Sequence, residues 1–198
     1  MIFRNDDVAW GCDIPRYREI QAIFENFGIK ETYSVVPVGQ NIYFPNPHLL
    51  SKRELENKLG LNLVTTDEQV DRFIKESLQR GHSISLHGWI HTDVVRYSYV
   101  DQLNHIKEAR DILENAYQTT IKYFVPPFNS YSDETVRACY QLGLQILGAN
   151  NNQLEWLVRD NCDFTGDPYC WYHAWRFTEP QKLKDYLCRH LPNNQVKS

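Results

Sequence analysis

Segments with the apolar pattern of strands alternate with segments of helical pattern along the whole chain. The strand-like runs, which are rich in β-branched and aromatic residues, cover residues 1–5, 32–36, 82–86, 121–125, 144–147 and 169–172. Such alternation favours a parallel sheet with helical crossovers, either closed as a barrel or open and doubly wound. We expect one α/β domain that spans residues 1–198, because this length buries one substantial core.

Polar residues mark the starts of most helical segments, and glycine ends several of them. Apolar residues at helical spacing follow Pro15 until Gly28, and another such segment ends at Gly81. Hydroxyl side chains in capping positions predict further helix starts at Ser51, Thr66, Ser98, Ser132 and Thr178.

The composition excludes several classes of protein. The formal net charge is −4 and there is no long basic run, so the sequence does not predict binding to nucleic acid or to an anionic membrane surface. No apolar run is long enough to span a membrane, and strand-like residues begin at Ile2, so we expect neither membrane insertion nor a secretory leader. The five cysteines are odd in number and scattered, which is typical of reduced thiols in the cytoplasm.

Ionisable or turn-forming residues follow several of the predicted strands. Asp6-Asp7, His87, Pro126-Pro127 and His173 all stand where a strand-like run ends. The carboxyl ends of parallel strands meet on one face of an α/β fold, where active sites form. We therefore expect these four segments to meet.

Two of these residues, Asp7 and His87, make a candidate metal site together with His91. His87 and His91 are four residues apart, and with the Asp7 carboxylate they would leave one position open for water, as in catalytic zinc sites. The donor set suits zinc first, and also cobalt, nickel, iron or manganese. Asp6, held off the metal, is placed to act as general base, and His173 is placed to act as general acid.

Aromatic and polar residues near the same segments are candidates for substrate binding. Exposed rings there could form the hydrophobic walls of a pocket. The candidates are Trp89, Pro127, Phe128, Asn129, Trp175 and Arg176.

The chain resembles the polysaccharide deacetylase superfamily, also called the NodB-homology domain or carbohydrate esterase family four. The resemblance rests on Phe3–Asp7, His87-Gly88-Trp89-Ile90-His91, Phe124–Phe128 and Tyr172-His173, in the family's order and rough spacing. It implies a distorted (β/α)7 barrel and an N- or O-acetylated sugar as substrate. It also implies Asp6 as base, Asp7 with the two histidines as metal ligands, and His173 as acid. On the same pattern, exposed rings near the site could stack on sugar faces, and backbone amides of the 127–129 turn could stabilise an oxyanion.

The sequence departs from the family pattern at three places. Arg4-Asn5 stand before the aspartates, where the family has a hydroxyl and an aromatic residue, and Val125 replaces an arginine thought to orient the base. Arg4 or Arg176 could supply the missing guanidinium. The family's aspartate segment that supports the acid corresponds most nearly to residues 160–163.

These features predict a metal-dependent amide or ester hydrolase. The favoured activity is N-deacetylation of an acetylamino sugar in the assembly of a surface polysaccharide or glycan precursor. One alternative is removal of another acyl group, such as formyl, or hydrolysis of a small non-sugar amide. The other is a catalytically silent carbohydrate-binding protein that retains the metal site. The oligomeric state stays open.

Overall fold

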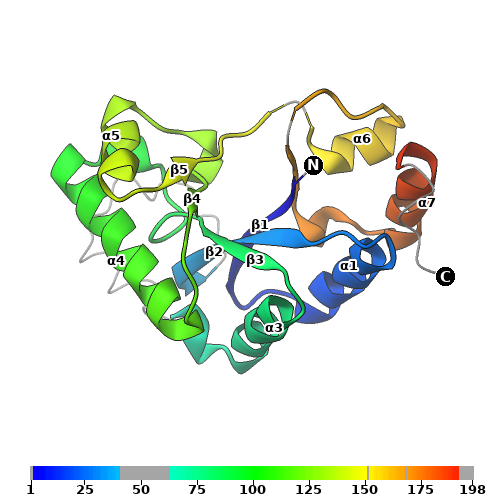
Figure 1. Ribbon diagram of the computed structural model, residues 1–198, viewed down its shortest axis with the longest axis horizontal. Helices are drawn as coiled ribbons and strands as arrows, with labels where there is room; N and C mark the ends of the chain where they lie inside the picture. Colours follow the sequence, from blue (N-terminus) through cyan, green and yellow to red (C-terminus); the bar gives the residue numbers. More distant parts are fainter. Residues whose placement is uncertain (1, 41–62, 151, 168, 192–198) are drawn as a thin grey trace.

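The computed structural model describes residues 2–40, 63–150, 152–167 and 169–191. Six parallel strands form one sheet in the order β5-β4-β3-β2-β1-β6 (Figure 1). They are β1 (Ile2–Trp10), β2 (Glu31–Gln40), β3 (Ser83–Leu86), β4 (Tyr123–Phe124), β5 (Gln145–Ile146) and β6 (Tyr169–Tyr172). The sheet curls into an incomplete barrel, so the predicted distorted α/β barrel is confirmed, with six strands in the described part of the chain.

Helices surround this sheet. They are α1 (Ile14–Asn26), α3 (Glu68–Gln79), α4 (Tyr99–Tyr117), α5 (Asp133–Gln141), α6 (Leu154–Asp160) and α7 (Pro180–His190), with 3-10 turns η2 (Val64–Thr66), η3 (Val94–Arg96), η4 (Pro127–Asn129) and η5 (Ala174–Arg176). Figure 1 shows α4 and α5 together beside β4 and β5, and α1, α6 and α7 gathered at the other side. No helix of the described ranges is long and apolar enough to cross a bilayer.

A buried aromatic group joins the sheet to α1. The ring of Phe24 on α1 lies 5.0 Å from that of Phe3 on β1 and 5.4 Å from that of Tyr172 on β6. All three side chains are buried. Such ring pairs add to the free energy gained from burying apolar surface, and they fix β1 against β6, the two strands that carry the proposed base and acid.

The first strand contains a bulge that the sequence pattern does not predict. Asn5 pairs with Tyr33 and Val8 with Val35, so Asp6 and Asp7 together lie opposite Ser34 alone. Successive strand residues normally point to opposite faces, but a bulge re-aims one of them. The strand therefore continues through the two aspartates to Trp10 and presents both of them on one side.

Several predicted boundaries shift in the structure. Strand β2 continues through Pro37, although proline has no amide hydrogen to donate. The neighbouring strand β3 ends at Leu86, opposite Val35, so no hydrogen bond from Pro37 to β3 is required. Helix α3 is capped by Asp67, which accepts from Gln69 and Val70 amides, rather than by Thr66. The predicted helix start at Ser51 lies outside the described residues.

Candidate metal centre and active-site pocket

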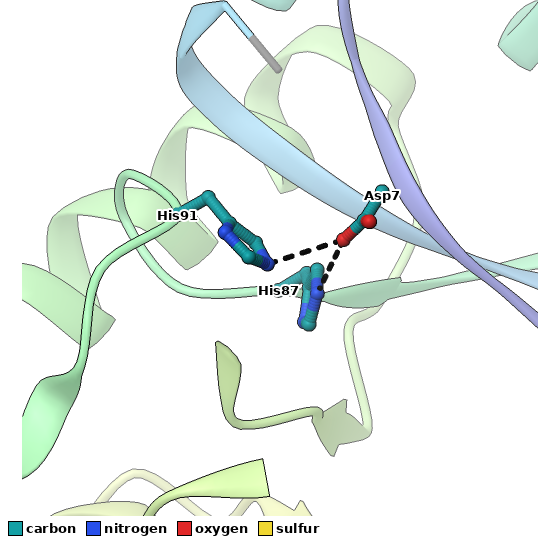
Figure 2. A group of neighbouring side chains, drawn as sticks. All are labelled: Asp7, His87 and His91. Atoms are coloured by element: carbon teal, nitrogen blue, oxygen red, sulfur yellow. Dashed lines mark hydrogen bonds and ion pairs between the residues drawn. The ribbon is translucent and has the colours of Figure 1, made fainter. Parts of the chain in front are cut away.

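Asp7, His87 and His91 meet at the carboxyl end of the sheet (Figure 2). The Nε2 atoms of both histidines lie 3.1 Å from Oδ1 of Asp7. Asp7 comes from the β1 bulge, and the two histidines come from the loop that follows β3. The ligand-type atoms of the three side chains all lie within 4.8 Å of one another.

A backbone contact fixes the orientation of His87. Its Nδ1 lies 2.8 Å from the carbonyl oxygen of Val125, which can only accept a hydrogen bond, so Nδ1 carries the proton. Nε2 therefore faces Asp7 and is the ring nitrogen left for a metal ion, which is the arrangement that a metal-ligating histidine needs. Val125 lacks the family's guanidinium, but its carbonyl orients a proposed ligand.

The charges within the cluster favour a carboxylate at Asp7. Burial raises the pKa of Asp7, but hydrogen bonds and charge interactions with His87 and His91 outweigh burial and hold the pKa well below its usual value. Burial lowers the pKa of His87, but its hydrogen bond to Asp7, the charges of Asp6 and Asp7 and the Val125 hydrogen bond together outweigh burial and raise the pKa overall. Asp7 is thus available as an anionic oxygen ligand.

Two side chains hold the backbone of Asp7 in an unusual conformation. Asp7 has a φ of 67°, in the left-handed region that residues other than glycine rarely adopt. The hydroxyl of Tyr17 and the thiol of Cys12 both donate to the Asp7 carbonyl oxygen, each at 3.3 Å. Tyr17 is buried, so this carbonyl is held from within the core. Such strain persists only where the surroundings impose it.

The donor set fits a divalent transition metal. Two imidazole nitrogens and one carboxylate oxygen match the ligands of catalytic zinc sites, in which ligand atoms stand about 3.3 Å apart around the ion. The observed spacing of 3.1 Å between each histidine and Asp7 is close to this value. A single ion could therefore be bound by all three side chains, Asp7, His87 and His91.

Arg4 binds Asp6 through both carboxylate oxygens. Nε of Arg4 lies 2.8 Å from Oδ1 and Nη2 lies 2.9 Å from Oδ2. The hydroxyl of Ser34 donates to Oδ1 at 2.6 Å. Nη1 of Arg4 is itself held by the carbonyls of Leu147 and Gly148, at 2.9 and 3.3 Å. Of the two arginines suggested by the sequence, Arg4 makes this contact, and Arg176 lies elsewhere on the pocket wall.

His173 is oriented by a carboxylate that the sequence pattern does not reveal. Oε1 of Glu155 lies 2.9 Å from Nδ1 of His173 and accepts the His173 backbone amide at 2.8 Å. Nε2 of His173 consequently faces the cluster, 3.5 Å from Oδ2 of Asp7. The supporting segment expected at residues 160–163 is incorrect: Asp160 pairs with its neighbour Arg159, and Asp163 pairs with His190.

These side chains line one pocket of about 580 Å³. Its walls comprise Arg4, Asp6, Asp7, His87, His91, Pro126, Phe128, Asn129, Ala149, Trp171, His173, Trp175 and Arg176. The expected convergence of four segments is therefore observed. Phe128 and Asn129 also have positive φ values, 58° and 54°, so backbone strain gathers at this pocket together with Asp7.

Two proposed substrate contacts do not reach the pocket. Trp89 is buried in the core, where its ring stacks on that of His105 on α4 at 5.4 Å, because burial there removes its large apolar surface from water. Pro127 is buried in η4, and its neighbour Pro126 lines the pocket instead. The Asn129 amide donates to the Pro126 carbonyl at 3.0 Å, so it is already engaged within the turn.

The curled parallel sheet and the cluster at the carboxyl ends of its strands define an α/β barrel with a metal-type site. A family model described as polysaccharide deacetylase matches residues 16–147, and the chain belongs to this family. No curated protein sequence matches the chain.

Solved structures of similar fold belong to the same group. A carbohydrate esterase family 4 pseudoenzyme from Bacillus anthracis superposes with a TM-score of 0.67 at 13% identity, over 96% of this chain and 59% of its own. The peptidoglycan deacetylase PdaC from Bacillus subtilis gives 0.63 at 15% identity, over 96% and 82%. A cobalt-bound family 4 acetyl xylan esterase from Clostridium thermocellum gives 0.62 at 16% identity, over 95% and 80%. The chain thus spans only about three fifths of the Bacillus anthracis protein.

Proposed function

We propose that this protein is a metal-dependent deacetylase that hydrolyses the acetamido group of an amino sugar. The observation that carries the proposal is the grouping of three ligand-type side chains, an arginine-held aspartate and a carboxylate-held histidine around one pocket. Membership of the polysaccharide deacetylase family supports the same chemistry. Removal of a formyl group would use the same residues.

Asp7, His87 and His91 are the proposed metal ligands. A divalent ion bound there, zinc first among the candidates, would polarise the acyl carbonyl and acidify water. Asp7 and His87 are buried and oriented by the surrounding backbone, so the site would need little rearrangement on loading.

Asp6 is the proposed general base. A carboxylate has about four lone-pair positions, and Arg4 and Ser34 occupy three of them, two on Oδ1 and one on Oδ2. Oδ2 therefore keeps a lone pair with which to take a proton from water. The bidentate arginine keeps Asp6 away from the metal ligands and in one orientation.

His173 is the proposed general acid. Glu155 holds the proton on Nδ1, so a second proton on Nε2 is the one that can be delivered to the departing amine. His173 follows β6, which pairs directly with β1, so the acid and the base stand on neighbouring strands. Proton transfer by such a positioned pair accounts for roughly 10²- to 10⁴-fold in rate.

The proposed compartment is the cytoplasm. All five cysteines are free thiols, which supports the expectation of a reducing environment. The natural substrate would then be a glycan precursor rather than finished polymer.

Acetate release from acetylated amino sugars by zinc- or cobalt-loaded protein tests the proposal. We expect turnover that a chelator abolishes and added metal restores. Asp6→Asn should reduce the rate by at least about 100-fold with metal content unchanged. Formylated analogues assayed in parallel decide between the two acyl groups. Stoichiometric metal and sugar binding without release of any acyl group would instead establish a silent carbohydrate-binding protein.

A further inference from the structure

Arg176 is the one charged group of the pocket wall that the described residues leave unneutralised. The other guanidinium, that of Arg4, is committed to Asp6. Among the described ranges, no carboxylate oxygen lies within ion-pair distance of Arg176. Its guanidinium carbon instead lies 4.8 Å from the centre of the Trp175 ring. A cation facing the pocket is therefore free for a ligand.

Among the residues that the structure describes, the pocket wall offers an anion no competing carboxylate. Its two carboxylates are Asp6 and Asp7, and both are engaged, the first by Arg4 and the second by the two histidines. The two arginines and two aspartates of the wall cancel in formal charge, so a divalent cation in the proposed metal site would leave the wall net positive. The field of the pocket thus favours a negatively charged substrate over a neutral one.

The backbone fixes Arg176 beside the proposed acid. Turn η5 begins directly after His173, and the Arg176 amide donates to the His173 carbonyl at 3.0 Å. Side chains three residues apart in a 3-10 turn lie on the same side, separated by about 6 Å along its axis. The Ala174 amide donates to Oδ1 of Asn5 at 3.1 Å, and Ala174 is buried, so the turn is anchored to β1.

The surroundings of Arg176 suit a sugar ring. The rings of Trp175 and Phe128 line the pocket and are half exposed, at 46% and 50%. Aromatic faces of this kind pack against apolar sugar faces. Arg176 also borders a second hollow over α6 and α7, so a substituent held there has room to extend away from the metal cluster.

We propose that Arg176 binds an anionic group of the acylated sugar, a phosphate on the anomeric oxygen or a carboxylate on the ring, next to the acyl group that is removed. This inference rests on the proposed function and names its substrate class. A planar guanidinium matches both anions through two parallel hydrogen bonds. The substrate would thus be a charged amino sugar rather than a neutral polysaccharide.

Three substrates test this inference: N-acetylglucosamine, N-acetylglucosamine 1-phosphate and N-acetylgalactosaminuronic acid. We expect metal-loaded wild-type protein to show kcat/KM at least tenfold higher for one of the two anions than for the neutral sugar. In Arg176→Gln, kcat/KM for that anion should fall at least tenfold further than kcat/KM for the neutral sugar. Arg176→Lys should restore part of the preference. Arg72→Gln, which removes an exposed arginine on α3 outside the pocket, is the matched control.

Equilibrium binding separates this inference from the proposed function. If no sugar is hydrolysed, titration calorimetry with the same three compounds still tests Arg176. Tighter binding of an anion to wild type, weakened at least tenfold in Arg176→Gln and unchanged in Arg72→Gln, would support the anion site even with deacetylation disproved. Equal affinity of wild type for the neutral and charged sugars would overturn the inference. So would a preference for the anion that survives in Arg176→Gln.

Discussion

Arg4 shows how one side chain compensates for a missing one. The arginine that the family places before its prolines is absent at Val125, yet Asp6 is held in two places by a guanidinium that comes from its own strand. The two residues are both on β1, two positions apart, and therefore point to the same face. The loss of the family arginine consequently does not leave the proposed base unsupported.

Substitution of Arg4 should impair the proposed reaction without removing the metal. Arg4→Lys keeps the charge but loses the two-point contact, so we expect acetate release to fall roughly 10- to 100-fold. Arg4→Met should be more severe and should also destabilise the fold, because it leaves a buried carboxylate unpaired. Metal analysis and thermal melts of both variants separate the two effects. Full activity in Arg4→Lys would show that charge alone suffices.

The buried hydroxyl of Tyr17 is predicted to support metal binding. It donates to the Asp7 carbonyl and so stabilises the left-handed backbone that aims the carboxylate. In Tyr17→Phe we expect the metal dissociation constant to rise about tenfold, the usual effect of losing a group that orients a ligand. Competition with a fluorescent chelator measures it. Tyr33→Phe removes an equally buried hydroxyl, one bonded to Glu31, and should leave metal affinity unchanged; equal effects in the two variants would refute the role of Tyr17.

At the scale of elements, the site depends on the short helix α6. This helix has seven residues, and it carries Glu155 to the backbone and ring of His173 after β6. Its apolar repeat is too brief, and its start lacks a side-chain cap, so neither periodicity nor capping reveals it. The carboxylate that supports the proposed acid could therefore be found only from the fold.

Removing the charge of Glu155 should affect turnover rather than substrate binding. We expect Glu155→Gln to lower kcat about 10- to 100-fold with little change in KM, because the imidazolium form of His173 loses its partner. Steady-state kinetics on the metal-loaded variant measure both constants. Asp163→Asn, in the segment 160–163 that the sequence pattern suggested, is the control and should behave as wild type. A change confined to KM would place Glu155 outside the proton-transfer step.

At the scale of the whole molecule, a second polar network crosses the barrel below the pocket. Glu31, at the start of β2, accepts hydrogen bonds from Tyr33 and from Tyr172 on β6. Its backbone amide donates to Nδ1 of His82, at the entry to β3. The network thus links β2, β3 and β6 through a fully buried carboxyl group, far in sequence from the metal ligands on β1 and after β3.

Burial raises the pKa of Glu31 to about 8. The hydrogen bond from Tyr33 opposes this rise, and the charge of Glu25 adds to it. The folded protein therefore binds more protons than the unfolded chain from about pH 4.5 to about pH 8, so its free energy of unfolding falls as the pH rises through this range. Glu31→Gln cannot titrate there. Between about pH 5 and about pH 8.5 we expect the free energy of unfolding of wild type to fall by about 4 kcal/mol relative to that of Glu31→Gln. Urea denaturation at both values measures this, and parallel pH profiles would contradict it.

The sequence by itself determined the alternation of strands and helices, the histidine pair, and the placement of Asp7 and His173 near strand ends. Those features depend on local periodicity and on spacing along the chain. The tertiary structure decided the rest: the bulge that turns Asp6 and Asp7 to one side, the pairing of Arg4 with Asp6, and the approach of Glu155 to His173. It also placed Trp89 in the core rather than in the pocket. Strand register and packing between distant segments set these contacts, and neither leaves a periodic signal in the chain.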